Sequence, residues 1–241
     1  MDRSQLDQAL AAFTKAVSGL SGTVASIVLY GSAARGDWVP GRSDVNLLLL
    51  VDDASPAALK RLNPAVTEWH SRGFTPPLIM SRVEWQQSTD VFPVEIADMQ
   101  ITHKVLCGED PVSALVINPA DLREAVEKEL RGKLIRLRQA YVRFNDSGVI
   151  LGGFAQASIA TFFALLRCIA VLQQRSPGQD ARTTAAGLAP ELRHDIDVAV
   201  DIASHRADPN WTCPPETFVR YLEVVRRAVD YIDTFQPIGE R

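Results

Sequence analysis

The sequence predicts an α+β fold in which a small sheet flanked by helices is followed by an all-helical bundle. Two patterns carry this prediction. Residues 1–116 alternate apolar runs of strand length with segments whose apolar residues recur every three or four positions. Residues 117–241 show only the second pattern, in long stripes typical of packed helices. We therefore expect two domains, residues 1–116 and residues 117–241.

The first domain is expected to open with a helix, two strands and a second helix. The opening helix has one apolar stripe, formed by Leu6, Leu10, Phe13 and Val17. The run SIVLY then predicts a strand that ends before Gly31. The continuous run NLLLLV predicts a strand buried on both faces. Ser55 and Pro56 favour a helix start, and we expect that helix to reach Arg72 with an interruption at Pro64.

The remainder of the first domain predicts two more short strands and a turn. The strands are PLIMS, residues 77–81, and VEIADM, residues 94–99. The segment KVLCGEDP then leads into a turn at residues 108–111.

The second domain predicts a bundle of amphipathic helices. Its first long helix carries the stripe Leu122, Val126, Leu130, Leu134, Leu137, Tyr141 and Phe144. After the break NDSG we expect a second apolar helix over about residues 149–172, in which Gly152 and Gly153 indicate close helix packing. A loop, a helix over about residues 192–203 and a last amphipathic helix from about Phe218 to Ile232 complete the bundle.

Composition narrows the function classes. The 241 residues are 46% hydrophobic and 22% charged, as in ordinary globular proteins, and the formal net charge is −4. Bulk nucleic-acid binding uses basic surfaces, so we expect no such partner. The most apolar segment contains Arg167 and is shorter than the roughly 20 residues needed to cross a bilayer, and the N-terminus does not look like a signal peptide. We expect a cytoplasmic protein with no membrane contact.

Polar residues of a distinct kind follow the first strand, in the stretch GSAARGDWVPGRSDVN. Gly31 and Ser32 stand where a strand ends and a helix begins, and such a place suits a phosphate because glycine permits close approach of the backbone. Asp44 and Asn46 stand at the start of the next strand. Alternate residues of a strand share a face, so their oxygens are expected to project together as ligands for a hard cation.

This pattern resembles the nucleotidyltransferase superfamily, which has the DNA polymerase beta-like fold. The likeness is strongest to its small bacterial members and to the aminoglycoside adenylyltransferases, whose signature is Gly-Ser, a loop of about ten residues and Asp-x-Asp on a strand. The resemblance covers about residues 24–111 and implies a mixed sheet. It also implies transfer of a nucleoside monophosphate, AMP from ATP or from another NTP, to a hydroxyl of a small-molecule or protein acceptor.

The resemblance also implies roles for individual residues. Asp44 and Asn46 would hold Mg²⁺ together with the residue that matches the family's third carboxylate, which is Glu95 or, as an alternative, Asp98. Glu95 would bind metal or act as base toward the acceptor hydroxyl. The residues that would bind the nucleotide are Gly31, Ser32, Arg35 and Arg42. The arginines would neutralise phosphates, although pairing with local acids such as Asp37 is an equally good interpretation.

Asn46 departs from the family pattern, because an amide oxygen coordinates a cation without bringing a charge. We expect one Mg²⁺ to bind acceptably and the second only weakly. The alternative function is therefore a nucleotide-binding module that is catalytically weakened or silent. The sequence leaves the acceptor, the base preference and the oligomeric state open.

Overall fold

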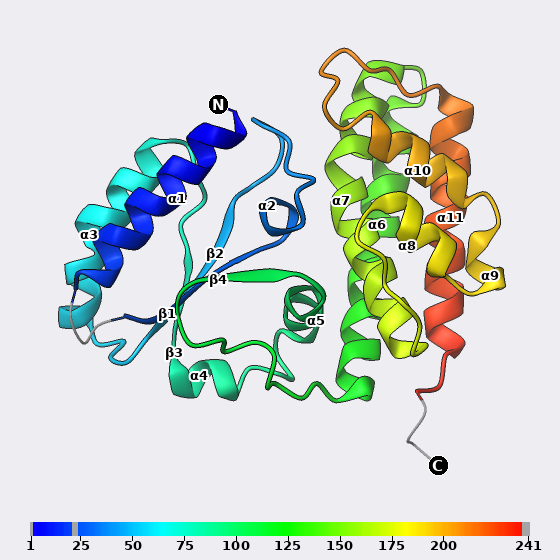
Figure 1. Cartoon of the computed structure of the whole chain (residues 1–241). Coiled ribbons are helices and arrows are strands. Elements are labelled where there is room, and N and C mark those ends of the chain that lie inside the picture. Colours follow the sequence, from blue (N-terminus) through cyan, green and yellow to red (C-terminus); the bar gives the residue numbers. More distant parts are fainter. Residues whose placement is uncertain (1, 21–23, 238–241) are drawn as a thin grey trace. The chain divides into compact units, whose positions relative to one another are not determined.

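The computed structural model describes residues 2–20 and 24–237, and it divides into two compact units (Figure 1). The first unit comprises residues 1–92 and 99–116, and the second comprises residues 93–98 and 117–241. The short segment 93–98 thus packs with the helical unit, although it lies within the first domain in sequence.

The first unit is built on a mixed four-stranded sheet with the order β3-β2-β1-β4. The strands are β1 (Val24–Tyr30), β2 (Asn46–Val51), β3 (Leu78–Ser81) and β4 (His103–Gly108). β1 pairs antiparallel with both β2 and β4, whereas β2 pairs parallel with β3. The mixed sheet expected from the sequence is therefore confirmed.

Two helices cover one face of this sheet. In Figure 1, α1 (Arg3–Ser18) and α3 (Pro56–Ser71) lie side by side. They pack on alternate residues of the two central strands, and this core includes Ile27, Leu29, Leu47, Leu49 and Val51. The alternation follows from the period of two along a strand.

α3 runs through Pro64 without interruption, contrary to the expectation from its sequence. Pro64 lies on the exposed side of the helix, while Leu62 and Trp69 are buried on the core side. Proline in a helix interior removes one hydrogen bond. Burial of the apolar side chains on both sides of Pro64 outweighs this cost.

The segment expected as a third strand, VEIADM, is helical. It forms most of α5 (Pro93–Ile101), which follows the short helix α4 (Arg82–Gln86). The buried residues Ile96, Ala97 and Met99 follow the spacing of a helix face rather than strand alternation. Six residues are too few for periodicity to separate the two structures, so the strand prediction was wrong, and β4 supplies the fourth strand instead.

Asp110 organises the turn after β4. Its carboxylate accepts hydrogen bonds from the amide of Val112 at 2.9 Å, from the hydroxyl of Ser113 at 2.6 Å and from the ring of His103 at 3.2 Å. Burial alone would raise the pKa of Asp110, but these hydrogen bonds prevail and lower it to about 2.

The second unit is helical. Its elements are α6 (Pro119–Phe144), α7 (Gly148–Leu172), α8 (Ala181–Gly187), α9 (Pro190–Arg193), α10 (Ile196–Ser204) and α11 (Pro215–Thr234). The expected loop corresponds to the residues before α8, and α8 itself was not predicted. The helix expected over residues 192–203 is divided into α9 and α10, because Asp195 adopts a left-handed backbone conformation with φ of 59°.

α7 is the central helix of this unit. By length and composition it is the one helix among the described residues that could cross a membrane, but half of its most apolar window is buried within the fold. Its Arg167 is buried and donates two hydrogen bonds, of 2.9 and 2.8 Å, to one oxygen of Asp98 on α5. An apolar helix that holds a buried ion pair and packs against α6, α10 and α11 is the core of a bundle.

Candidate functional site

Gly31 forms the junction between β1 and the short helix α2 (Ser32–Arg35). Its φ is 70°, a conformation in which a side chain is strained. A Cβ atom at this position would lie 2.9 Å from Nδ2 of Asn46. The backbone conformation therefore favours glycine here, and any larger residue would also displace the side chain of Asn46.

The pairing of β1 with β2 brings the two halves of the motif together. Tyr30 is the register partner of Asn46, so Gly31 and Ser32 follow the end of one strand while Asn46 begins the neighbouring strand. Ser32 is 9% exposed. The sequence separates these residues by a loop, and the antiparallel register places Asn46 against Gly31.

Asp44 and Asn46 alternate with core residues, as expected from strand geometry. Val45 and Leu47 are buried in the core under α1 and α3, so the side chains of Asp44 and Asn46 point to the other side of the strand. Asp44 is exposed and Asn46 is half-buried. The two side chains thus leave the core face of the sheet and remain accessible to a ligand.

Thr75, which the sequence did not single out, contacts Asp44 of this pair. Its hydroxyl donates to Oδ1 of Asp44 at 3.0 Å. The contact follows from the parallel register of β2 and β3, in which Leu48 faces Leu78. The signal that would have found Thr75 is this pairing, and nothing in the local sequence indicates it.

The side-chain amide of Asn46 makes no hydrogen bond within the described part of the chain (residues 2–20 and 24–237). A purely structural role for Asn46, as a donor to a buried carbonyl, therefore has no acceptor among the described residues. Its oxygen is available as a ligand, and Asp44 keeps a second oxygen besides the one that contacts Thr75.

The loop between the two halves of the motif is held closed by its own residues. The indole of Trp38 donates to the carbonyl of Ser43 at 2.9 Å, and the hydroxyl of Ser43 accepts from the amide of Val39 at 3.1 Å. Trp38 also packs on the core. This closure fixes the point at which the chain enters β2 at Asp44.

The two arginines of the motif have different surroundings. The side chain of Arg35 is 7% exposed and its Nε lies 3.4 Å from a carboxylate oxygen of Asp37. This is the local pairing that the sequence left as an alternative to phosphate binding. Arg42 is exposed, and its amide donates to the carbonyl of Val39.

α2 is a short helix. It has four residues, and its turn is closed by hydrogen bonds from Ala34 and Arg35 to the carbonyl of Gly31. The dipole of a single turn is small, so this helix adds little field of its own at the site.

Glu95 and Asp98 lie on α5, in the second unit. On the strand expected for this segment, an offset of three residues would turn the two carboxylates to opposite faces. That expectation is wrong, because residues three apart on a helix lie on neighbouring positions of one side. Asp98 is paired with the buried Arg167, whereas Glu95 is exposed. The pairing gives Asp98 a structural role and leaves Glu95 as the carboxylate of α5 that can meet a ligand.

The oxygen donors at the start of β2 fit Mg²⁺ in kind, because hard cations take carboxylate and amide oxygens. Within residues 2–20 and 24–237, no group of three or more histidine, cysteine, aspartate or glutamate side chains that could hold a metal is found. The structure thus assembles a pair of ligands, Asp44 and Asn46, rather than a complete protein-made cage. Such a pair suits a metal that takes further ligands from phosphate oxygens.

Comparisons with known proteins agree with this geometry. Residues 10–92 match the model of the nucleotidyltransferase domain. The fold is similar to that of spectinomycin adenyltransferase AAD(9) from Enterococcus faecialis, solved with ATP and spectinomycin, with a TM-score of 0.55 and 13% identity over 90% of this chain and 98% of that chain. No curated protein sequence matches the chain. The resemblance indicated by the motif is thus confirmed: residues 10–92 are similar to the nucleotidyltransferase domain, and the fold is similar to that of a solved adenyltransferase.

Proposed function

We propose that this protein transfers AMP from ATP, in a Mg²⁺-dependent reaction, to a hydroxyl group of an acceptor molecule. The observation that carries the proposal is the register of β1 and β2, which sets Asn46 against Gly31 and leaves Asp44 accessible next to it. The nucleotidyltransferase domain and the solved relative with bound ATP support the choice of reaction and of nucleotide.

In the proposed reaction the acceptor oxygen attacks the α-phosphorus of ATP. A new P–O bond forms, the bond to the β-phosphate oxygen breaks, and pyrophosphate leaves with that bond's electron pair. Gly31 and Ser32 hold phosphate oxygens, and Asp44 with Asn46 would hold Mg²⁺. When bound, Mg²⁺ supplies electrostatic stabilisation of the charge on the phosphate oxygens.

Glu95 is proposed to accept the proton of the acceptor hydroxyl. Its exposure on α5 supports this role, since a general base must reach the proton it removes. Asp98 is a weaker choice because it is engaged by Arg167. Arg42 is proposed to neutralise phosphate charge, and Arg35, with its side chain buried beside Asp37, to position the loop.

A second candidate function, nucleotide binding without turnover, is favoured by Asn46, which brings one charge fewer than the family pattern. A pyrophosphate-release assay with ATP, Mg²⁺ and mixtures of hydroxyl compounds separates the two functions. Transfer predicts release that requires both Mg²⁺ and an acceptor. Glu95→Gln should lower this turnover more than it lowers ATP affinity, whereas equal losses would assign Glu95 to ground-state binding. ATP binding with no release under any condition would favour the binding module.

A further inference from the structure

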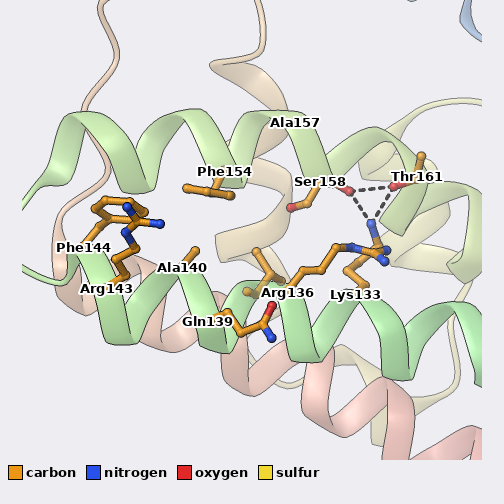
Figure 2. Close-up of a pocket in the computed structure, with 11 residues that line it drawn as sticks. Lys133, Arg136, Gln139, Ala140, Arg143, Phe144, Phe154, Ala157, Ser158 and Thr161 are labelled. Atoms are coloured by element: carbon orange, nitrogen blue, oxygen red, sulfur yellow. Dashed lines mark hydrogen bonds between the residues drawn. The ribbon is translucent and has the colours of Figure 1, made fainter.

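A cavity of about 400 Å³ lies between α6 and α7 in the second unit, apart from the motif described above (Figure 2). Its volume is in the range of small-molecule sites. Its lining combines cations with aromatic rings, and the residues that matter are Lys133, Arg136, Arg143, Phe144, Phe154 and Thr161.

Lys133 is the most unusual of these residues, since it is a cation that is only 5% exposed. Its Nζ donates to the carbonyl of Ser158 at 2.9 Å and to the hydroxyl of Thr161 at 2.6 Å. An ammonium has three donors, so one remains beyond these two contacts. Burial, helped by the nearby charge of Arg136, lowers the pKa of Lys133 to about 8.

The cations of this cavity lack the carboxylate partners that other arginines of α6 possess. Arg123 and Arg131 both pair with Glu127 on the same helix. By contrast, Lys133 and the arginines at positions 136 and 143 form no ion pair with any residue in the described ranges, and the described lining contains no carboxylate. Glu129 acts electrostatically on Lys133 from outside the lining. A concave site whose lining has three cations and no carboxylate nevertheless attracts an anion.

The cavity has two chemically different ends. Figure 2 shows Lys133 with Ser158 and Thr161 at one end, and Arg143 with Phe144 at the other. The rings of Phe144 and Phe154 stack with centroids 6.0 Å apart, and Phe154 remains 41% exposed. An exposed ring within a cavity offers a flat apolar surface to a ligand.

The spacing of the two ends fits a molecule of nucleotide size. Phe154 precedes Ser158 by four residues and Thr161 by seven residues on α7. At 1.5 Å per residue, these separations are about 6 and 10 Å along the helix axis. A phosphate monoester carries about −1.5 to −2 charges at neutral pH, which suits the cationic end better than a single carboxylate does.

We propose that this cavity is a binding site for an organic phosphate, in which Lys133 and Arg136 hold the phosphate and Phe154 supports a planar ring. The site would lie wholly within the second unit, and its existence does not depend on the reaction proposed for the first unit. Nucleotides and ring-bearing sugar phosphates share this chemistry.

Calorimetry in EDTA tests the proposal, because the absence of Mg²⁺ silences metal-dependent nucleotide binding at Asp44. The probes are AMP, ribose 5-phosphate and adenosine, each titrated into the full chain at low ionic strength. The proposal predicts that AMP binds most tightly, since it alone carries both ring and phosphate. Equal affinity for adenosine and AMP, or no binding of AMP at millimolar concentration, would overturn it.

Two matched variants locate the binding. Arg136→Glu reverses one charge of the cavity, and Arg138→Glu makes the same change on the same helix at an exposed residue outside the lining. We expect at least a tenfold loss of AMP affinity in the first variant and less than about a twofold loss in the second. Equal losses in both variants would show general electrostatics rather than a site and would overturn the proposal. Both changes are at exposed positions, so both variants should fold. Circular dichroism verifies this.

Discussion

The substitution Asn46→Asp adds one charge to the candidate site with almost no change in volume, and its effect on stability can be worked out from the structure. The amide of Asn46 makes no hydrogen bond within residues 2–20 and 24–237, so no structural donor is lost. The main cost is repulsion between the new carboxylate and Asp44, two residues earlier. The variant should therefore be slightly less stable than the wild type when no metal is present.

The size of this repulsion follows from strand geometry. Two residues of extended chain span about 6.6 Å. At that distance two unit charges repel by about 0.6 kcal/mol in bulk water and by about 2.5 kcal/mol at an effective dielectric constant of 20. Asp44 is exposed, so we expect about 1 kcal/mol, equivalent to a fall in melting temperature of about 2–4 °C for a chain of this size.

Mg²⁺ should reverse the effect if Asp44 and Asn46 form the metal site. A ligand present at ten times its Kd stabilises the folded state by about 1.4 kcal/mol. Because the variant should bind Mg²⁺ more tightly, its melting temperature should rise more with Mg²⁺ and ATP than that of the wild type. The double variant Asp44→Asn with Asn46→Asp restores the original charge and should lose the repulsion.

Thermal denaturation with and without Mg²⁺ and ATP decides the matter. If Asn46 were instead a structural donor, the variant would lose about 1–3 kcal/mol. A loss that Mg²⁺ does not rescue would refute the reasoning.

Three further predictions concern the scaffold. Asp98→Ala leaves the buried guanidinium of Arg167 without its partner and should lower the free energy of unfolding by about 3–5 kcal/mol. Urea denaturation measures this loss, and a small change would show that water replaces the carboxylate. Gly152→Ala places a Cβ 2.8 Å from the main-chain oxygen of Trp211 and should destabilise the protein by about 1–3 kcal/mol. Gly153→Ala, with open space around it, should stabilise the helix by up to about 1 kcal/mol, and equal effects of the two changes on the melting temperature would contradict this difference in packing. Because the pKa of Asp110 is lowered in the folded state, its carboxylate stabilises the fold above about pH 4, and this stabilisation is lost as the pH falls toward 2. The difference in free energy of unfolding between wild type and Asp110→Asn should therefore vanish over that range. A difference that is independent of pH would exclude the ionised carboxylate as its cause.

The sequence predicted most of the sheet because its central strands are long apolar runs. NLLLLV is buried along its whole length apart from Asn46. A short apolar run of this kind, flanked by turn residues, indicates a strand buried on both faces. The segment of Glu95 was different. Its six residues fit a strand and a helix equally well, and the choice was decided by burial of Ile96, Ala97 and Met99, which the sequence cannot show.

The candidate site was predictable where it depends on local spacing and unpredictable where it depends on pairing. Gly31, Ser32, Asp44 and Asn46 were found from one continuous stretch. The contact of Thr75 with Asp44 needs the parallel pairing of β2 with β3. The pairing of Asp98 with Arg167 needs a contact between residues 69 positions apart. Neither contact can be predicted from the local sequence.

The central claim is that Asp44, beside Gly31 and Asn46, binds nucleotide through a metal. The most direct test is calorimetric titration of a non-hydrolysable ATP analogue into wild type and Asp44→Ala, each with Mg²⁺ and with EDTA. Asp44 is exposed, and among residues 2–20 and 24–237 its side chain accepts a hydrogen bond from Thr75, so the variant should remain folded. The account predicts that Mg²⁺ raises the affinity of the wild type and has no such effect on the variant. A Mg²⁺-dependent affinity that is unchanged in Asp44→Ala would contradict it.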